Sequence, residues 1–495
     1  MLKISRLPES LRGVKIATLV VQKVISRYFN LYFSKNRPVR QNSPLFSSNP
    51  RKVIKLRYII LILLALFVLG FGIKNINYIS PKSSLYEGIV GSFTEDNLPI
   101  VVTSLLSDPL IEIDKTGKPK PVLLTGWQTN NDATVYTLKL KPDLIWNDGT
   151  KVNSSDIEVN IPDVSISYPD DQTIEFKLID SFGAFPSLLN SPVFKKGTLV
   201  GTGKYVVKGK TKTHGLISQL VLNPVESEDM SLPNIFVKFY PEEKTAKTAL
   251  SLGEVDSLIG INDISEFSNI PSLKVMRVIS YNKFVAVFYN TKDPILSDRI
   301  FRKALNSSIP QIEGEEKAVT SIPSHSWFFN DTIPDLTSDL KLAKQHLAKV
   351  EKGKDSTITL TTTHYLSKTG EKIIQNWKEV GIKAVLRIES GVPQNFQALL
   401  IAQPILSDPD QYPLWHSTES KTNVSKYDSQ RADKDLEDGR KISDLEKRKE
   451  RYLDLQKVLS DDVPASFLYF PKTNVVYRKK YEDILNQVLP LQSPN

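Results

Sequence analysis

The chain contains no cysteine. This absence excludes disulfides, thiolate metal sites, iron–sulfur clusters, cysteine nucleophiles and a lipid-modified cysteine as a membrane anchor. Serine-hydrolase (G-x-S-x-G) and zinc-protease (H-E-x-x-H) motifs are also missing. The chain has only five histidines, and they are not spaced as metal ligands. We therefore expect neither an enzyme nor a resident metal or cofactor.

Acidic residues are almost absent from one part of the chain. Residues 1–57 contain thirteen Lys and Arg but only one acidic residue, Glu9, which gives this segment a net charge of +12. The other 438 residues carry 51 basic and 54 acidic groups, a net charge of −3. A nucleic-acid-binding protein would distribute its positive charge over the folded body. The overall charge of +9 therefore does not indicate nucleic-acid binding.

One long hydrophobic run follows the basic N-terminal segment and separates it from the mildly acidic remainder of the chain. Tyr58–Ile73 (YIILILLALFVLGFGI) has no charge over sixteen residues, which spans about 24 Å as a helix. Flanking apolar residues lengthen it, and flanking Lys and Arg are able to reach the interfaces. We predict a transmembrane helix over residues 57–75; a buried core helix or a cleaved signal peptide are the alternatives.

The charge distribution orients such a helix. The positive-inside rule places residues 1–56 in the cytoplasm and the C-terminal body outside the cell membrane. Apolar residues at near-helical spacing between Leu7 and Phe29 indicate either an amphipathic helix on the inner leaflet or a disordered basic tail.

The body alternates strand and helix patterns. Alternating apolar residues predict strands at 133–140, 173–178, 356–363, 382–388 and 464–470. Helical spacing predicts helices at 335–350, 368–380 and 432–459. The strand–helix–strand order between residues 356 and 388 predicts a parallel pair of strands. Gly201-Thr-Gly-Lys204 lacks the spacing of a phosphate-binding loop and is interpreted as a tight turn.

Several short motifs follow one another in a familiar order. They are Leu85–Gly91, Asp108–Ile113, Gly126-Trp127, Tyr136–Leu140, Trp146–Thr150, Asn153–Ile157, Val200–Tyr205, Ala249–Asp256, Tyr289–Thr291, Phe301–Leu305, Asp408–Tyr412, Trp415–Ser417, Asn423–Tyr427 and Asp462–Pro464. Together they resemble the extracellular solute-binding proteins of family 5, the peptide-binding subunits of ABC transporters. The resemblance covers most of residues 83–480.

The resemblance implies an α/β, two-lobed periplasmic-binding-protein-like (type II) fold with mixed sheets. It implies that residues 83–262 with 472–495 form lobe 1 and that residues 263–471 form lobe 2. The family's ligand lies between the lobes, and the implied partners are a peptide or other small solute and an ABC transporter permease.

The resemblance also suggests ligand-binding residues. Trp415 would offer a flat apolar wall, and Asp408 or Asp410 would meet a ligand amine. A turn or a helix N-cap at Asp408-Pro409 is the alternative. Tyr289 and Asn290 are expected to contact the ligand as well.

The sequence departs from the family at one important position. Peptide-binding members place an aspartate a few residues before the Asp-Pro motif, where it pairs with the free amine of the peptide. Here that position is Ile405. The stretches after Ile157 and Ile309 are also shortened. The leading hypothesis is a transport receptor for peptides, and the alternative is a signalling or scaffold protein that retains the fold.

Overall fold

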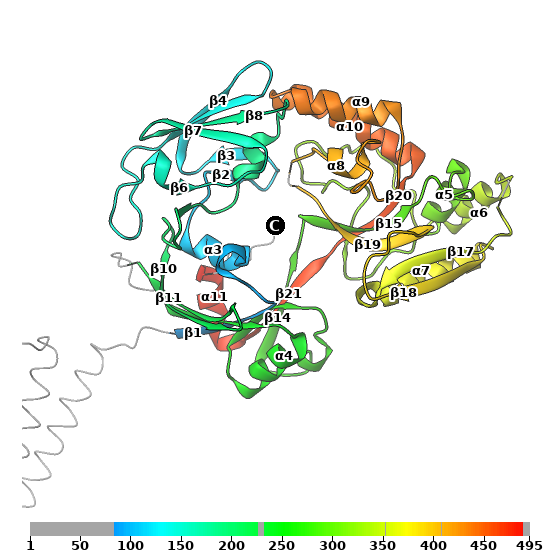
Figure 1. The fold of residues 1–495 in the computed structure, drawn as a ribbon. Coiled ribbons are helices and arrows are strands. Elements are labelled where there is room, and N and C mark those ends of the chain that lie inside the picture. The colour runs from blue at the N-terminus through cyan, green and yellow to red at the C-terminus, as the bar shows by residue number, and fades with distance from the viewer. Residues whose placement is uncertain (1–83, 226–231, 352, 407, 489–495) are drawn as a thin grey trace, which may run out of the picture. The chain divides into compact units, whose positions relative to one another are not determined.

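The computed structural model describes residues 84–225, 232–351, 353–406 and 408–488 (Figure 1). The predicted cytoplasmic segment 1–56 and the predicted membrane helix 57–75 lie outside these residues. No helix within the described ranges combines the length and the apolar character needed to cross a bilayer.

A seven-stranded mixed sheet forms the base of the first half. Its strand order is β10 (Tyr205–Thr213), β11 (Leu216–Pro224), β12 (Asn234–Tyr240), β1 (Ser84–Val90), β13 (Ser257–Ile261), β21 (Lys472–Arg478) and β14 (Leu273–Ile279). Strand β1 runs parallel to both of its neighbours, and the other pairs are antiparallel. One apolar cluster joins the sheet to α3 (Ile100–Leu106) and α11 (Glu482–Val488), and another joins it to α4 (Glu243–Leu252).

A smaller antiparallel sheet lies between β1 and β10 in the sequence. Its order is β4 (Leu124–Thr129), β5 (Val135–Leu140), β8 (Thr173–Leu178) and β7 (Val164–Asp170). Two short strand pairs accompany it: β2 (Ile111–Ile113) with β3 (Pro119–Pro121), and β6 (Ile157–Glu158) with β9 (Phe194–Lys195). The core of this part surrounds Trp146, Tyr136 and Phe185.

The second half is built on a six-stranded sheet. Its order is β16 (Glu316–Lys317), β20 (Ala465–Phe470), β15 (Lys283–Tyr289), β19 (Ala398–Pro404), β17 (Ile358–Thr363) and β18 (Ala384–Glu389). Strand β15 has the almost continuously apolar sequence KFVAVFY, which is typical of a strand that is buried on both faces of its sheet. Val285, Val287 and Tyr289 enter one core, whereas Phe284, Ala286 and Phe288 enter the other.

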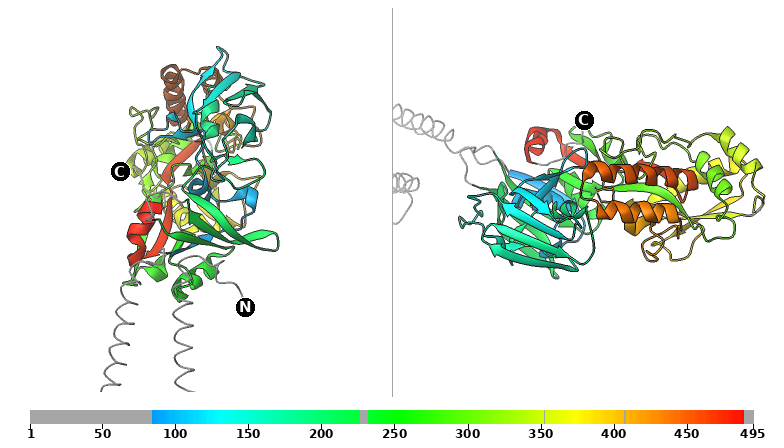
Figure 2. Two further views of the ribbon diagram at one scale, coloured as in Figure 1. Left: turned by 90° about the vertical axis from the view of Figure 1, so that its left-hand side faces the viewer. Right: turned by 90° about the horizontal axis from the view of Figure 1, so that it is seen from above.

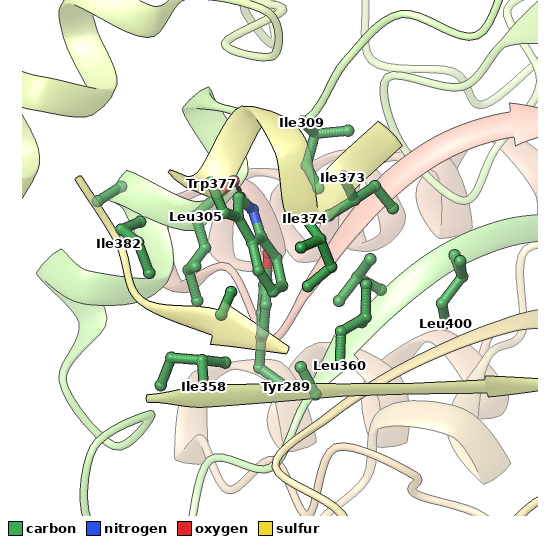
Figure 3. Close-up of a cluster of buried hydrophobic side chains, with 14 of the residues drawn as sticks. Tyr289, Leu305, Ile309, Ile358, Leu360, Ile373, Ile374, Trp377, Ile382 and Leu400 are labelled. Carbon is green, nitrogen blue, oxygen red and sulfur yellow. Dashed lines mark hydrogen bonds between the residues drawn. The ribbon is translucent and has the colours of Figure 1, made fainter. Parts of the chain in front are cut away.

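Helices cover both faces of this sheet. The first core involves α5 (Arg299–Ser307), α6 (Leu340–Ala348) and α7 (Ser367–Glu379), and the second involves α8 (Tyr412–Trp415), α9 (Gln430–Lys441) and α10 (Leu445–Asp462). Figure 3 shows the first core, where the indole Nε1 of Trp377 donates to the carbonyl of Leu305 at 3.2 Å. Strands β17 and β18 pair in parallel around α7, which confirms the predicted strand–helix–strand unit. Short 3-10 turns lie at Glu95–Asn97, Ser154–Asp156, Phe185–Leu189, Ser265–Phe267, His364–Leu366 and Lys479–Tyr481.

The single helix expected over 432–459 was a wrong prediction. The structure has two helices, α9 and α10, which lie side by side (Figure 2). Ile442 is extended, and the Asp444 carboxylate accepts a hydrogen bond from the backbone N–H of Lys447 at 3.0 Å. The chain therefore turns at Ser443 because Asp444 caps a new helix instead of continuing the first one.

The chain passes twice between the seven-stranded and the six-stranded sheets. One crossing follows β14 at Ser280–Asn282, and the other is Pro471 between β20 and β21. The crossings are adjacent, since the Ser280 N–H donates to the Pro471 carbonyl at 2.8 Å. Lobe 1 consists of residues 84–279 with 472–488, and lobe 2 consists of residues 283–470. The sequence-based division at residue 263 placed β14 in lobe 2, but its pairing with β21 puts it in the sheet of lobe 1.

A candidate ligand site between the lobes

A cavity of about 270 Å³ lies where the two lobes meet. Lobe 1 contributes the turn Glu112–Gly117, and the crossing connection contributes Tyr281. Lobe 2 contributes Ile322, Pro323, His325, Ser326, Phe328, Ile405 and Leu406. Ligand sites are commonly clefts at domain boundaries, and about 300–1,000 Å³ is their usual range. In the conformation described, the cavity accommodates a small ligand or one end of a longer one.

The lobe 1 wall is a tight turn organised by one carboxylate. Asp114 Oδ1 accepts from the Thr116 N–H at 2.9 Å, the Thr116 hydroxyl at 2.7 Å and the Lys118 N–H at 3.0 Å. The Lys120 ammonium lies 3.0 Å from Asp114 Oδ2. Burial alone would raise the pKa of Asp114, but these hydrogen bonds and the Lys120 charge hold it well below its usual value. The turn is therefore ordered by an ionised aspartate at neutral pH.

The lobes touch at the edge of this cavity. The Thr116 carbonyl accepts from the backbone N–H of Trp327 at 2.9 Å and from the Ser326 hydroxyl at 3.3 Å. The Lys118 ammonium lies 5.6 Å from the centre of the Trp327 ring, within the range of a cation–π interaction. These contacts tie lobe 1 to lobe 2 beside the cavity.

The lobe 2 wall is largely apolar. The Ile405 N–H donates to the Asn282 carbonyl at 2.8 Å, which fixes the end of β19 to the crossing connection. The Ile405 side chain is partly buried against a core cluster, and the Leu406 side chain is 45% exposed. Tyr281 and His325 meet edge to face, with ring centres 4.3 Å apart. Burial lowers the pKa of His325 despite the nearby Glu316, which favours the neutral imidazole.

Asp408 and Asp410 occupy a second place where the lobes meet. Arg448 binds Asp408 through two hydrogen bonds of 2.6 and 2.9 Å, and both side chains are almost fully buried. The Ser187 hydroxyl of lobe 1 donates to Asp408 Oδ2 at 3.2 Å. Arg440 Nε donates to Asp410 Oδ2 at 2.8 Å.

Other contacts from lobe 1 complete this junction. The Gly183 N–H donates to the Arg440 carbonyl at 2.6 Å, and the Arg440 guanidinium lies between the rings of Phe182 and Tyr412, at 5.2 and 4.1 Å from their centres. A further cavity, of about 310 Å³, adjoins it and is lined by Trp127, Tyr136, Ser187, Asp408 and Arg448 among others. Within the described residues, the Asp408 carboxylate thus accepts hydrogen bonds from the side chains of Arg448 and Ser187.

The other predicted site residues lie apart from both cavities. Trp415 is fully buried, stacks on Phe288 and donates from Nε1 to Gln411 Oε1 at 2.8 Å. Tyr289 is buried in the other core, where its hydroxyl lies 2.7 Å from that of Ser466. Asn290 donates to the Phe396 carbonyl at 3.1 Å. Asp408 Oδ1 accepts from the Asp410 N–H at 2.9 Å, which is the turn expected as the alternative role of Asp408-Pro409.

Sequence reasoning missed most of the residues that bring the lobes together. Ser187 and Asp408 are 221 positions apart, so no local pattern links them. Arg448 is one of many charged residues in its helix. Asp408 and Asp410 were singled out as ligand contacts, not as partners of Arg448, Ser187 and Arg440, and Ile405 gave a signal through its departure from the family pattern. No group of three or more His, Asp or Glu in the described part of the chain is arranged to hold a metal ion.

Comparison with known proteins identifies the family of this chain. Residues 118–425 match the bacterial extracellular solute-binding proteins, family 5 (middle region). The chain belongs to this family.

Individual relatives are distant but extend over most of the chain. The oligopeptide-binding protein AppA of Bacillus subtilis is 22% identical, over 87% of this chain and 96% of that protein. A crystal structure of a nickel ABC transporter protein from Bacillus halodurans has a TM-score of 0.67 at 15% identity, covering 81% of this chain and 96% of its own. The Helicobacter pylori protein DppA in complex with the peptide STSA has a TM-score of 0.58 at 20% identity, covering 81% and 95%. At these identities the structures establish the fold alone.

Proposed function

We propose that this protein is a membrane-anchored, extracytoplasmic solute-binding protein that captures peptides between its two lobes for an ABC transporter. The cavity of about 270 Å³ walled by both lobes is the observation that supports this most directly. Family membership and the peptide-binding names of several relatives point to the ligand class. The role is one of binding, without chemical turnover of the ligand.

Ligand capture would use the two crossings as a hinge. Only Ser280–Asn282 and Pro471 connect the sheets of the lobes, so rotation there would open the cavity. A ligand that touches Glu112–Gly117 on one side and Ile405 on the other favours the closed state, because only that state offers both sets of contacts. The closed form would then dock on the permease.

Residues 57–75 would anchor this receptor. The charge of +12 before this segment orients the helix with residues 1–56 in the cytoplasm. Since the chain has no cysteine to lipidate, a peptide anchor is the available way to keep the receptor near its permease. Protease treatment of intact cells tests this: the body should be digested, while an epitope tag before residue 56 should survive.

Direct binding measurements test the ligand class. Full-length protein in detergent should show a thermal shift and a calorimetric signal with members of a peptide library containing free and blocked N-termini. Cells lacking the protein should lose uptake of the same peptides. A library without any binder would contradict the proposal.

A non-transporting receptor or scaffold is the second candidate, and Ile405 favours it because the family's amine-pairing carboxylate is absent. Deletion of residues 1–50 separates the two functions. Normal peptide uptake after this deletion would support transport, whereas lost function with intact peptide binding would support signalling through the basic segment.

A further inference from the structure

The interior of the interlobe cavity is built from uncharged groups. Tyr281, Ile322, Pro323, His325, Phe328, Ile405 and Leu406 supply aromatic, imidazole and aliphatic surface. The charged residues among its described lining are Glu112, Asp114 and Lys115. Glu112 and Lys115 are exposed to solvent, so their charges are hydrated at the rim.

Asp114 is not available to a ligand cation. Its Oδ1 accepts three hydrogen bonds from its own turn, and its Oδ2 faces the Lys120 ammonium. A ligand ammonium would have to displace Lys120, which neutralises this carboxylate already. His325 offers a neutral imidazole beside Tyr281, which provides a hydrogen bond but no charge. Glu316 lies close enough for its charge to act on both rings, but it is not among the residues that line the cavity.

The position that faces a free peptide amine in the family resemblance is Ile405. Its side chain and that of Leu406 line the cavity together. An ammonium pressed against them would lose part of its hydration without gaining an ion pair, which is unfavourable. An acyl group placed there would bury apolar surface and leave no charge uncompensated.

Resting on the proposed function, we propose that the cavity takes peptides whose N-terminus is blocked, with the uncharged acyl end against Ile405 and Leu406. The cavity of about 270 Å³ accommodates such an end and its first residue. Hydrogen bonds to the ligand amides come from the Tyr281–His325 pair and from the Glu112–Gly117 turn. Selectivity thus arises from the absence of a carboxylate at position 405 rather than from a new contact.

Matched peptide pairs test this in the wild-type, full-length protein. Each pair has one sequence, from three to six residues, with either a free amine or an N-acetyl group. Calorimetry should give at least tenfold tighter binding for the acetylated member. Equal or tighter binding of the free-amine member would overturn this inference while leaving peptide binding intact. Failure of every peptide, free or blocked, would instead remove the proposed function and this inference with it.

Ile405→Asp should reverse the preference for acetylated over free-amine peptides, because it places a carboxylate at the cavity wall. Ile179→Asp is the matched control, since Ile179 is 76% exposed and lies outside the cavity, and its preference should stay that of wild type. Leu406→Asp, at a more exposed position in the same wall, serves if Ile405→Asp does not fold. A folded cavity variant that keeps the wild-type preference for acetylated peptides would contradict the inference.

Discussion

At the residue scale, two sites of buried charge are stabilised in opposite ways. Arg448 and Asp408 form a bidentate ion pair whose two members are nearly inaccessible to water. Glu87, in the central strand β1, is fully buried without a cation. It accepts a hydrogen bond from the Ser257 hydroxyl, and its Oε1 lacks a partner among the described atoms. The ion pair is stable only when both Arg448 and Asp408 are present, whereas Glu87 is stable in the core when its carboxyl group is protonated.

Removing one member of the ion pair should destabilise lobe 2. We expect Arg448→Ala to lower the free energy of unfolding by about 3–5 kcal/mol, because Asp408 would be left buried and uncompensated. Arg451→Ala is the control on the same helix, since Arg451 is 44% exposed and 4.0 Å from Asp435; it should change stability by less than about 1 kcal/mol. Denaturant titration followed by tryptophan fluorescence measures both. Similar losses for the two variants would contradict this assignment.

Glu87 should make stability depend on pH. Burial raises its pKa to about 8, with the Ser257 hydrogen bond opposing the shift and Asp256 adding to it. The folded state therefore holds a proton that the unfolded state releases near its ordinary value of 4.5. The stabilisation is complete below about pH 4.5 and is lost as the pH rises towards 8.

Glu87→Gln should flatten the fall in stability between pH 5 and 8, because the amide cannot ionise. Glu371→Gln, on the exposed surface of α7, should leave the profile unchanged. Thermal melts across this pH range provide the measurement. An identical slope for wild type and Glu87→Gln would show that Glu87 does not titrate in this range.

At the element scale, the α9–α10 pair determines much of the junction between the lobes. The hairpin presents the Arg440 carbonyl to Gly183 and brings Arg448 to Asp408. Its turn depends on the Asp444 cap. Gly439 lies under the Tyr452 ring, where a Cβ atom would approach within 2.8 Å, so the two helices pack at close range.

Asp444→Ala should cost about 1 kcal/mol of stability, since the first N–H groups of α10 lose their acceptor. Glu450→Ala, at an exposed position in the same helix, should stay within about 0.5 kcal/mol of wild type. Hydrogen exchange should locate the Asp444→Ala effect in the first turn of α10. Unchanged protection there would argue against a capping role.

At the scale of the whole molecule, the described conformation brings lobe 1 into contact with lobe 2 on both sides of the chain crossings, as well as at the crossings, where Lys472 donates to the Gly314 carbonyl. Thr116 meets Ser326 and Trp327 beside the candidate cavity, Gly183 meets Arg440 of α9, and Ser187 meets Asp408. A Cβ atom on Gly183 would lie 2.1 Å from the Ile442 carbonyl oxygen in the opposite lobe. Closure therefore requires glycine at this position.

Gly183→Ala should impede closure without disturbing either lobe. We expect at least tenfold weaker ligand binding and a melting temperature close to that of wild type, because the clash exists only when the lobes meet. Gly391→Ala is the control, since a methyl group there meets no atom within 4 Å. It should bind like wild type.

Closure itself is measurable because the chain has no native cysteine. Spin labels on Ile179→Cys and Lys441→Cys report the distance between the lobes, and ligand should shorten it in the parent protein but not with Gly183→Ala. A ligand-induced shortening that Gly183→Ala leaves unchanged would contradict this account of closure.

The sequence alone determined the features that depend on local pattern. Alternating residues located β5 and β8, helical spacing located α7, and motif order indicated the family. The separation of +12 from −3 is likewise a property of the sequence. The secondary-structure predictions succeed because the spacing of apolar residues over a short segment indicates a strand or a helix.

Only the tertiary structure decided how distant residues are used. It assigned Asp408 to Arg448 and Ser187, buried Trp415 and Tyr289 in separate cores, and gave Ile405 a place in a cavity wall. It also broke the predicted long helix at Ser443. The sequence shows that a carboxylate is present, but it does not show whether that carboxylate contacts a ligand, an arginine or water. The choice depends on which segments the fold brings within hydrogen-bonding distance, across separations of up to 221 residues in this site.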